Sequence, residues 1–346
     1  MNGEGGRAEV GVVLFQMGGP DSPEAVEPFL YNLFSDPDII DFPLARLARE
    51  PLARLISSKR ARKAREHYAR MGGGSPINEL TKRQAQALEA ELRKTLDARV
   101  FVAMRYWHPL TQETAEAVHA AQSRDLVLLP LYPQFSKTTT GSSFNEWRRC
   151  YSNGAARVRT IQDYHDFPPY IEAVVEKINE GLGRFTSGPG GELESANLER
   201  SLRKAVVEDV ALVFSAHGVP VNSIERGDPY QKQIERTVRL ALERGGWQNP
   251  WRLCYQSRSG PGRWLRPFLE ETLDELAAGR VARVLVIPIA FVSDHVETLE
   301  ELHVEARAYA LRAGFEQFEV MPALNDSPRF IRALAHLVLR EVRLAP

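Results

Sequence analysis

Six short apolar runs, each about the length of a β-strand, recur along the chain. They lie at 10–15, 100–107, 126–133, 211–218, 251–257 and 284–292. Continuous runs rich in β-branched residues are typical of strands that are buried on both faces of a parallel sheet. The stretches between many of the runs are long enough for helices. The pattern therefore predicts an α/β protein built from strand–helix–strand units.

The two halves of the chain repeat one plan. The runs at 10–15 and 211–218 both end in a glycine turn, and Pro130 and Pro288 stand at nearly the same place in the third run of each half. A chain of 346 residues holds about two domains. We therefore predict two domains with parallel sheets that face each other across a cleft. Ligands of such sheets bind outside the carboxyl ends of the strands.

A Pro-rich break at 166–169 separates the two halves. The expected domains are 9–165, which includes a basic segment at 39–65, and 166–325, which carries a candidate metal or proton site. The last residues, 326–346, are expected to form a helix that packs back on the first domain.

Composition excludes several classes of protein. The 44 Lys and Arg residues nearly cancel the 45 Asp and Glu residues, so no overall charge attracts nucleic acid. The first residues lack a signal segment, and no apolar run is long enough to span a bilayer. With only Cys150 and Cys254, the chain cannot bind a four-thiolate iron–sulfur cluster or a Cys-x-x-Cys zinc site. These features indicate a cytoplasmic protein.

The run at 284–292 continues through Ser293, Asp294 and His295 into apolar residues at helical spacing. Glu297 and Glu301 are four residues apart and share one face of the expected helix. Two carboxylates on one face repel each other, which suits a site where a cation or a proton passes between them. The structural alternative is a capping box from Asp294 to Glu297, with Glu301 as an ordinary solvated residue.

His217 lies at the end of another strand, between the small residues Ala216 and Gly218 that leave its imidazole approachable. A single histidine at a strand end is usually structural. An imidazole opposite a carboxylate pair can also hold a divalent metal or accept protons. The lack of a further Asp/His cluster disfavours a metallohydrolase and favours a weakly held metal in transit.

Two further segments have a structural and a functional interpretation. Residues 39–65 mix apolar and basic side chains, and Pro43 and Pro51 are expected to interrupt any long helix. Such a segment can lie on an anionic membrane surface, or its apolar face can belong to the core. The loop 134–143 contains Ser136 among many hydroxyls and is either an anion site or a capped helix start.

Distinctive short motifs occur throughout the chain. The second half contains S-A-H-G-V-P at 215–220, R-G-D-P-Y at 226–230, Q-S-R-S-G-P at 256–261 with Trp264 and Leu265, and A-F-V-S-D-H-V-E-T-L-E-E-L at 290–302. The first half contains M-G-G-P-D-S at 17–22, G-G-G-S-P-I at 72–77, R-Y-x-H-P-L-T at 105–111 and L-Y-P-Q-F-S-x-T-T-T-G-S-S at 131–143. Together these motifs resemble those of the ferrochelatases, and the resemblance extends in order from about residue 10 to 340.

The resemblance implies two Rossmann-like domains and insertion of ferrous iron into a porphyrin to make haem. It implies that His217 and Glu297 are the catalytic and metal-binding pair, and that Asp294, His295 and Glu301 form the rest of an acidic path. The porphyrin-binding residues that it implies are Met17, Tyr68, Ser75, Arg105, Tyr132, Ser136 and Trp264. The segment 39–65 resembles a lip over the pocket that makes peripheral contact with the inner membrane.

The chain has no C-terminal cysteines, unlike some members of the family, so we expect no iron–sulfur cluster and no cofactor beyond the Fe²⁺ substrate. Met17 favours protoporphyrin IX over a porphyrin with more carboxylates. Two other functions stay open. One is a tetrapyrrole chelatase for cobalt or nickel, and the other is a non-catalytic porphyrin or haem carrier. The division of work between His217 and Glu297 also stays open.

Overall fold

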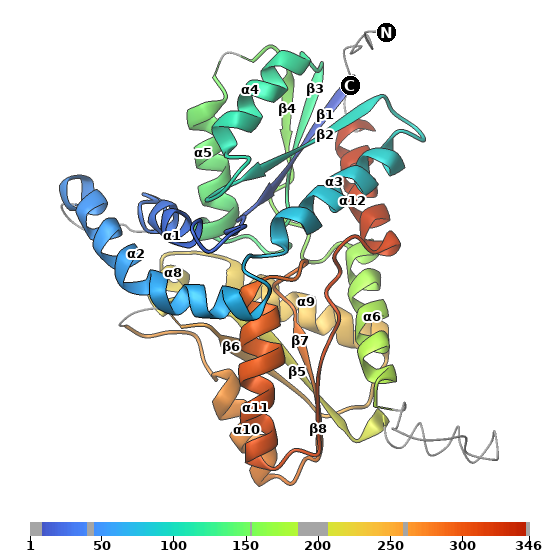
Figure 1. Cartoon of the computed structure of the whole chain (residues 1–346). Helices are drawn as coiled ribbons and strands as arrows, with labels where there is room; N and C mark the ends of the chain where they lie inside the picture. Colours follow the sequence, from blue (N-terminus) through green and yellow to red (C-terminus); the bar gives the residue numbers. More distant parts are fainter. Residues whose placement is uncertain (1–8, 40–44, 153, 186–206, 259–261, 344–346) are drawn as a thin grey trace. The chain divides into compact units, whose positions relative to one another are not determined.

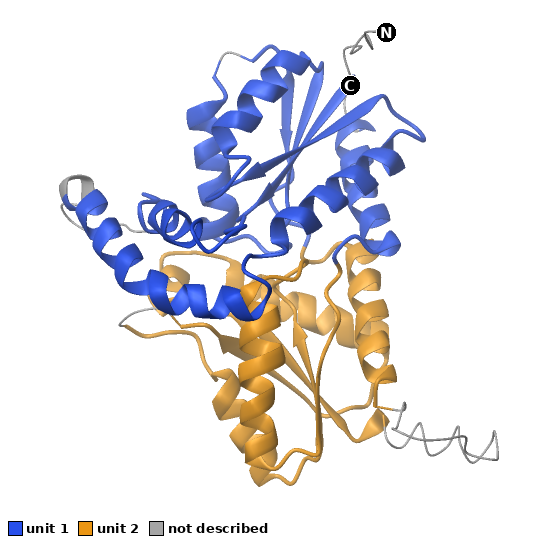
Figure 2. Cartoon of the chain, in the orientation of Figure 1, with its two compact units in different colours: residues 1–164, 325–346 blue, residues 165–324 orange. Residues whose placement is uncertain are grey.

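A computed structural model describes residues 9–39, 45–152, 154–185, 207–258 and 262–343 (Figure 1). The chain divides into two compact units (Figure 2). Unit 1 contains residues 1–164 and 325–346, and unit 2 contains residues 165–324. The division points lie one residue before the expected boundaries at 166 and 326.

Each unit contains one four-stranded parallel sheet, which confirms the predicted α/β class. The strands of unit 1 are β1 (Val10–Gln16), β2 (Ala98–Met104), β3 (Asp125–Pro130) and β4 (Arg157–Thr160), in the order β2-β1-β3-β4. Those of unit 2 are β5 (Val210–His217), β6 (Trp251–Gln256), β7 (Arg283–Pro288) and β8 (Gln317–Val320), in the order β6-β5-β7-β8. The two sheets thus have the same strand order, as the repeated plan of the sequence indicated.

The prediction missed the fourth strand of each sheet. Strands β4 and β8 have only four residues each, and β4 has the sequence R-V-R-T with three exposed side chains. Both are edge strands, which bury fewer side chains than central ones. Neither therefore produces the continuous apolar run that marks a buried strand.

Helices cover both faces of each sheet (Figure 1). In unit 1, α4 and α5 lie on one face and α3 and α12 on the other; in unit 2, α10 and α11 lie opposite α6 and α9. The α-helices are α1 (Val26–Phe34), α2 (Ala45–Arg70), α3 (Ile77–Leu92), α4 (Thr111–Ala121), α5 (Ser142–Cys150), α6 (Pro168–Gly183), α8 (Val221–Glu225), α9 (Tyr230–Gly245), α10 (Leu269–Ala278), α11 (Arg307–Ala313) and α12 (Pro328–Arg343). The third strand of each sheet precedes a π-helix, η1 (Lys137–Gly141) or η2 (Glu297–Ala306).

The last helix of each half of the chain completes the other unit. After β4 the chain enters unit 2 with α6, and after β8 it returns to unit 1 with α12. Helix α12 packs on α3, where Gln84 donates to the carbonyl of Asn325 at 2.9 Å and Arg83 lies 3.5 Å from Asp326. Leu334, Leu337 and Val338 of α12 are buried, so this return to unit 1 adds apolar area to its core.

Helix α2 corrects the expectation that proline breaks the segment 39–65. Pro51 lies inside the 26-residue helix, whereas Pro43 lies outside the described residues. The missing backbone donor at Pro51 is offset by packing on α1. Ala53, Ser57 and Ala61, which recur every four residues, are buried. Tertiary packing thus outweighs the local preference of proline for a helix end.

Arginine side chains strengthen the contact between α1 and α2. Arg54 lies over the ring of Tyr31 at 5.8 Å and Arg60 over that of Phe34 at 5.3 Å. Arg65 pairs with Glu27 at 3.2 Å. Part of the basic segment therefore serves the packing of the protein itself. No described helix of the chain combines the length and the apolar character that crossing a membrane requires.

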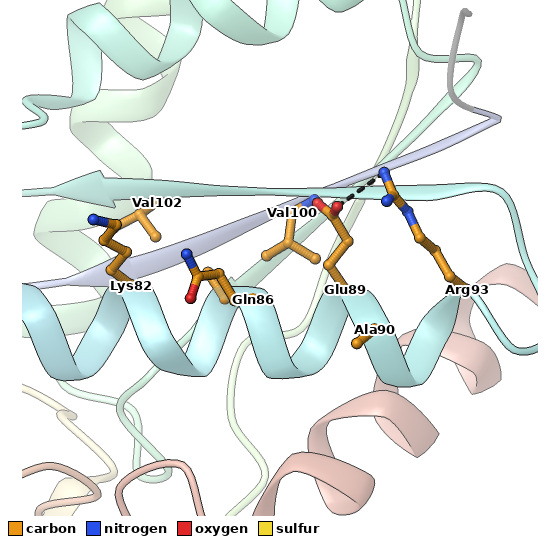
Figure 3. Close-up of a pocket in the computed structure, with 8 residues that line it drawn as sticks. Lys82, Gln86, Glu89, Ala90, Arg93, Val100 and Val102 are labelled. Atoms are coloured by element: carbon orange, nitrogen blue, oxygen red, sulfur yellow. Dashed lines mark hydrogen bonds and ion pairs between the residues drawn. The ribbon is translucent and has the colours of Figure 1, made fainter.

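A groove lies between α3 and the edge strand β2 (Figure 3). Two charged side chains that line it bond to the backbone of that strand. The carboxylate of Glu89 accepts from the amide of Val100 at 2.8 Å, and the guanidinium of Arg93 donates to the carbonyl of Ala98 at 3.0 Å. The two side chains form an ion pair at 2.9 Å. Their hydrogen bonds occupy a backbone amide and a backbone carbonyl of the edge strand that could otherwise pair with another strand. The groove contains none of the predicted site residues.

Candidate active site

His217 and Glu297 meet at the carboxyl end of the sheet in unit 2. His217 is the last residue of β5 and Glu297 the first of η2, and Nδ1 of the histidine lies 2.8 Å from a carboxylate oxygen of the glutamate. The histidine side chain is 37% exposed and the glutamate side chain 14%. The pair is therefore hydrogen-bonded and accessible from solvent, with Nδ1 engaged and Nε2 on the other side of the ring.

Neighbouring backbone holds His217 in place. The hydroxyl of Tyr230 donates to the carbonyl of His217 at 3.1 Å. The amide of Gly218 donates to the carbonyl of Gln256 at 2.7 Å, and a Cβ at Gly218 would lie only 2.9 Å from that oxygen. Only glycine allows the exits of β5 and β6 to approach so closely. Trp264 flanks the same turn, 3.7 Å from that Cβ position.

Glu301 lies beside the pair on η2. Its carboxylate accepts a hydrogen bond from the hydroxyl of Ser257, the residue that follows β6. The π-helix has i→i+5 hydrogen bonds and wider turns than an α-helix, and such helices are frequent at functional sites. The structure thus brings His217, Glu297 and Glu301 together from two separate elements. The contact with His217 disfavours the structural alternative of a capping box from Asp294 to Glu297, because it engages the carboxylate of Glu297.

His295 and Asp294 lie next to this group but bond locally. Nδ1 of the buried His295 lies 3.0 Å from the carbonyl of Ser293. The ring of Phe291 stands 4.5 Å from that of His295 and 6.4 Å from that of His217. Asp294 accepts from the hydroxyl of Thr298 at 3.1 Å. These contacts orient the start of η2, the helix that carries Glu297 and Glu301.

Burial and charge shift the pKa values of the three central groups. Burial alone would lower the pKa of His217, but the charge and hydrogen bond of Glu297 outweigh it and raise that pKa above its usual value. Burial would raise the pKa of Glu297, but the charge and hydrogen bond of His217 hold it well below its usual range. Burial and the adjacent charge of Glu297 raise the pKa of Glu301 to about 7. The charge of each partner thus favours the ionised form of the other, and Glu301, with its pKa of about 7, can take up or release a proton near neutral pH.

Glu301→Gln is expected to change how stability depends on pH. Between pH 4.5 and about 7 the folded protein keeps a proton on Glu301 that the unfolded chain has released, so stability falls as pH rises. Replacing the carboxyl group with an amide removes this fall in stability with rising pH. At pH 8 the variant should therefore gain roughly 1–3 kcal/mol in the free energy of unfolding relative to the wild type. Urea unfolding at pH 5 and pH 8 measures it, and an equal difference at both pH values would contradict the assignment.

The residues of unit 1 that the resemblance implied gather at and near the carboxyl end of the other sheet. Met17 follows β1, Arg105 follows β2 and Tyr132 lies two residues beyond β3. The amide of Ser75 donates to the carbonyl of Pro20 at 2.7 Å, which places Ser75 beside the exit of β1. Tyr68 is buried in the last turn of α2, and Ser136 caps η1 by accepting from the amide of Thr138.

Arg105 is the centre of a buried polar network that the sequence did not predict. Its guanidinium donates to the hydroxyl of Ser142 at 2.8 Å and lies 2.9 Å from the carboxylate of Asp36. Asp36 has no exposed side-chain area and also accepts from Tyr106 at 2.7 Å and from Ser142 at 2.5 Å. Glu146 stands 3.7 Å from Arg105. The charge of Arg105 is therefore largely balanced within unit 1.

Comparison with known proteins assigns the family. A family model described as Ferrochelatase matches residues 9–342. The chain belongs to the ferrochelatase family. Two relatives named ferrochelatase show how much of the chain is shared. That of Gloeobacter violaceus is 44% identical over 341 residues, which cover 97% of this chain and 98% of the relative. That of Gloeothece citriformis is 43% identical over 339 residues, which cover 96% of this chain and 82% of the relative.

Membership in this family makes the chain a lyase-type metal chelatase of haem synthesis.

A solved structure described as that of CbiX, the terminal enzyme for biosynthesis of siroheme in denitrifying bacteria, aligns with a TM-score of 0.49 and 12% identity. The alignment covers 96% of this chain and 98% of that one.

Proposed function

We propose that this chain inserts ferrous iron into protoporphyrin IX, with His217 and Glu297 as the residues that handle the metal and the protons. Membership in the ferrochelatase family supports the reaction. The observation that carries the assignment of residues is the accessible contact of 2.8 Å between the imidazole and the carboxylate. The reaction releases two protons and changes no oxidation state, so Fe²⁺ is a substrate and no redox cofactor is needed.

The arrangement suits both parts of the reaction. Because Nδ1 of His217 is engaged by Glu297, Nε2 is the nitrogen left to approach the metal or an inner nitrogen of the porphyrin. Binding a metal requires a neutral imidazole, so the proton held on His217 must leave as the metal arrives. Glu301, with a pKa of about 7, is suited to receive it. A site that binds a bent macrocycle more tightly than a flat one would supply the rest of the catalysis.

The iron insertion itself is tested by anaerobic incubation with Fe²⁺ and protoporphyrin IX, followed by the loss of porphyrin fluorescence. Parallel incubations with Co²⁺ and Ni²⁺ measure the preference among metals. A protein that binds the porphyrin without quenching it in the presence of Fe²⁺ would be a carrier, and faster turnover of Co²⁺ or Ni²⁺ would indicate another chelatase.

Two features of unit 1 support protoporphyrin IX over a porphyrin with more carboxylates. Met17 is an apolar side chain at the exit of β1, and the guanidinium of Arg105 is already paired with Asp36 and Ser142. Met17 carries no charge and the charge of Arg105 is already balanced, so neither residue offers an unpaired cation to an additional propionate. Turnover of protoporphyrin IX and coproporphyrin, compared as kcat/KM, tests the choice, and a preference for coproporphyrin would contradict it.

We also propose that α2 attaches the protein reversibly to an anionic membrane surface. Lys59, Arg62 and Lys63 of α2 are exposed, whereas Arg54 and Arg60 stack on aromatic rings of α1. Leu55 of the same helix is 53% exposed. Each cation near an anionic leaflet contributes roughly 1 kcal/mol. A poorly soluble porphyrin can be loaded directly from such a surface.

Reversal of Lys59, Arg62 and Lys63 to Glu is expected to abolish co-sedimentation with vesicles that contain phosphatidylserine. The matched control reverses Lys232, Arg236 and Arg239, which are exposed on α9. Binding by the wild type should weaken as salt rises, because screening shortens the range of the attraction. Wild-type binding that ignores salt, equal loss in both variants, or no binding at all would assign α2 to the packing of the protein alone.

A further inference from the structure

Ser257 has an unusual backbone conformation at the carboxyl end of β6. Its φ angle is +61°, in the left-handed region that residues other than glycine rarely adopt. Gln122 and Arg280, two other described residues with positive φ, follow the ends of α4 and α10, where this conformation is common. Ser257 instead follows a strand and lies beside the active site, so its conformation calls for a local explanation.

A directed chain of hydrogen bonds passes through Ser257. The hydroxyl of Ser215 donates to the side-chain oxygen of Gln256 at 2.6 Å, and the side-chain amide of Gln256 donates to the hydroxyl oxygen of Ser257 at 3.5 Å. Ser257 in turn donates to the carboxylate of Glu301. A serine hydroxyl has one hydrogen. Ser215 and Gln256 are buried, so the chain ends with the hydroxyl of Ser257 directed at the carboxylates: it bonds to Glu301 and also interacts with Glu297.

This bond acts on the carboxylate pair. Glu297 and Glu301 lie on the same π-helix, four residues apart. Two carboxylates that close repel each other. If Glu301 were not held, its carboxylate could rotate toward His217 and compete with Glu297 for the imidazole, because His217 also interacts with the charge of Glu301. A fixed donor on Glu301 prevents that exchange.

We propose that Ser257 is a positioning residue that holds Glu301 in place and keeps Glu297 directed at His217 for the incoming metal ion. The inference rests on the proposed function of the His217–Glu297 pair. The left-handed backbone is the means, because it turns the hydroxyl from the end of β6 toward η2. Contacts of this kind behind metal-handling residues typically change metal affinity or activity by about 10–100-fold.

The alternative is that Ser257 only ties β6 to η2 and contributes stability. Two substitutions separate these roles, because they change the backbone and the hydroxyl in opposite directions. Ser257→Gly relieves the left-handed backbone and removes the hydroxyl. Ser257→Thr keeps the hydroxyl, but its β-branched side chain fits a positive φ poorly. Stability and activity should therefore rank the two variants in opposite order.

Ser257→Gly should fold with a melting temperature at or above that of Ser257→Thr. Its kcat for iron insertion should fall about 10–100-fold, with the KM for protoporphyrin IX within about twofold of the wild type. Its affinity for Co²⁺ without porphyrin, measured by calorimetry, should fall about tenfold. Ser257→Thr should retain more kcat and more Co²⁺ affinity. Arg280→Gly, which relieves the same backbone conformation away from the site, is the control and should leave both unchanged.

The proposal is overturned if Ser257→Gly keeps kcat and Co²⁺ affinity within about twofold of the wild type. It is also overturned if activity follows stability across the two variants. A wild-type protein that inserts no iron would refute the proposed function instead. In that case the Co²⁺ affinities of the wild type and Ser257→Gly still decide whether Ser257 positions the pair.

Discussion

His217→Ala is expected to abolish iron insertion, with a decrease in kcat of roughly 10²–10⁴-fold or more, while porphyrin still binds. The imidazole can both hold a metal and carry a proton, and 37% of the His217 side chain is exposed. Insertion is measured by the loss of porphyrin fluorescence under anaerobic conditions, and binding by titration of the porphyrin absorption band.

Removing the imidazole also leaves the largely buried carboxylate of Glu297, 14% exposed, without its partner, which costs stability. His217→Gln is therefore a second variant, because its amide can still donate to Glu297 but does not titrate. Both variants should be inactive, and Gln should have the higher melting temperature. His119→Ala, at an exposed position in the last turn of α4, is the control. Near-normal turnover in folded His217→Gln would remove His217 from the reaction.

Glu297→Gln should lower kcat by a similar factor in a folded protein. The substitution keeps the size of the side chain and removes the charge that holds His217 protonated. Because Glu297 does not cap η2, little helix stability is at risk. The remaining effect is on the proton and the metal. Glu243→Gln, exposed on α9, controls for loss of a carboxylate elsewhere.

The pH dependence of stability gives Glu297→Gln a second readout. The lowered pKa of Glu297 stabilises the fold above about pH 4.5, and this contribution disappears as pH falls toward about 2. The raised pKa of His217 stabilises it below about pH 6.5, and this contribution disappears as pH rises through the raised value. The loss of stability in the variant should therefore be largest between pH 4.5 and 6.5. Full activity together with an unchanged pH profile would contradict the ion pair.

Local patterns in the sequence were sufficient for most of the fold. The six apolar runs correspond to the central strands and one edge strand of each sheet, because burial on both faces leaves a continuous apolar signal. The repeated plan correctly indicated two sheets of the same type. The short edge strands β4 and β8 were missed because their residues alternate or are polar. Helix α2 continues past Pro51, contrary to the expectation from the sequence, because packing against α1 outweighs the loss of one backbone hydrogen bond.

The sequence by itself determined the candidate residues at the strand ends, since His217 lies at the end of one predicted strand and Glu297 and Glu301 follow another. Only the tertiary structure decided their contacts. His217 and Glu297 are 80 residues apart, and Ser257 and Glu301 are 44 apart. Such pairs form when parallel strands align their carboxyl ends at one edge, which depends on sheet order and on the left-handed backbone of Ser257. Periodicity describes a residue's own element, whereas a hydrogen bond between elements depends on how the whole unit packs.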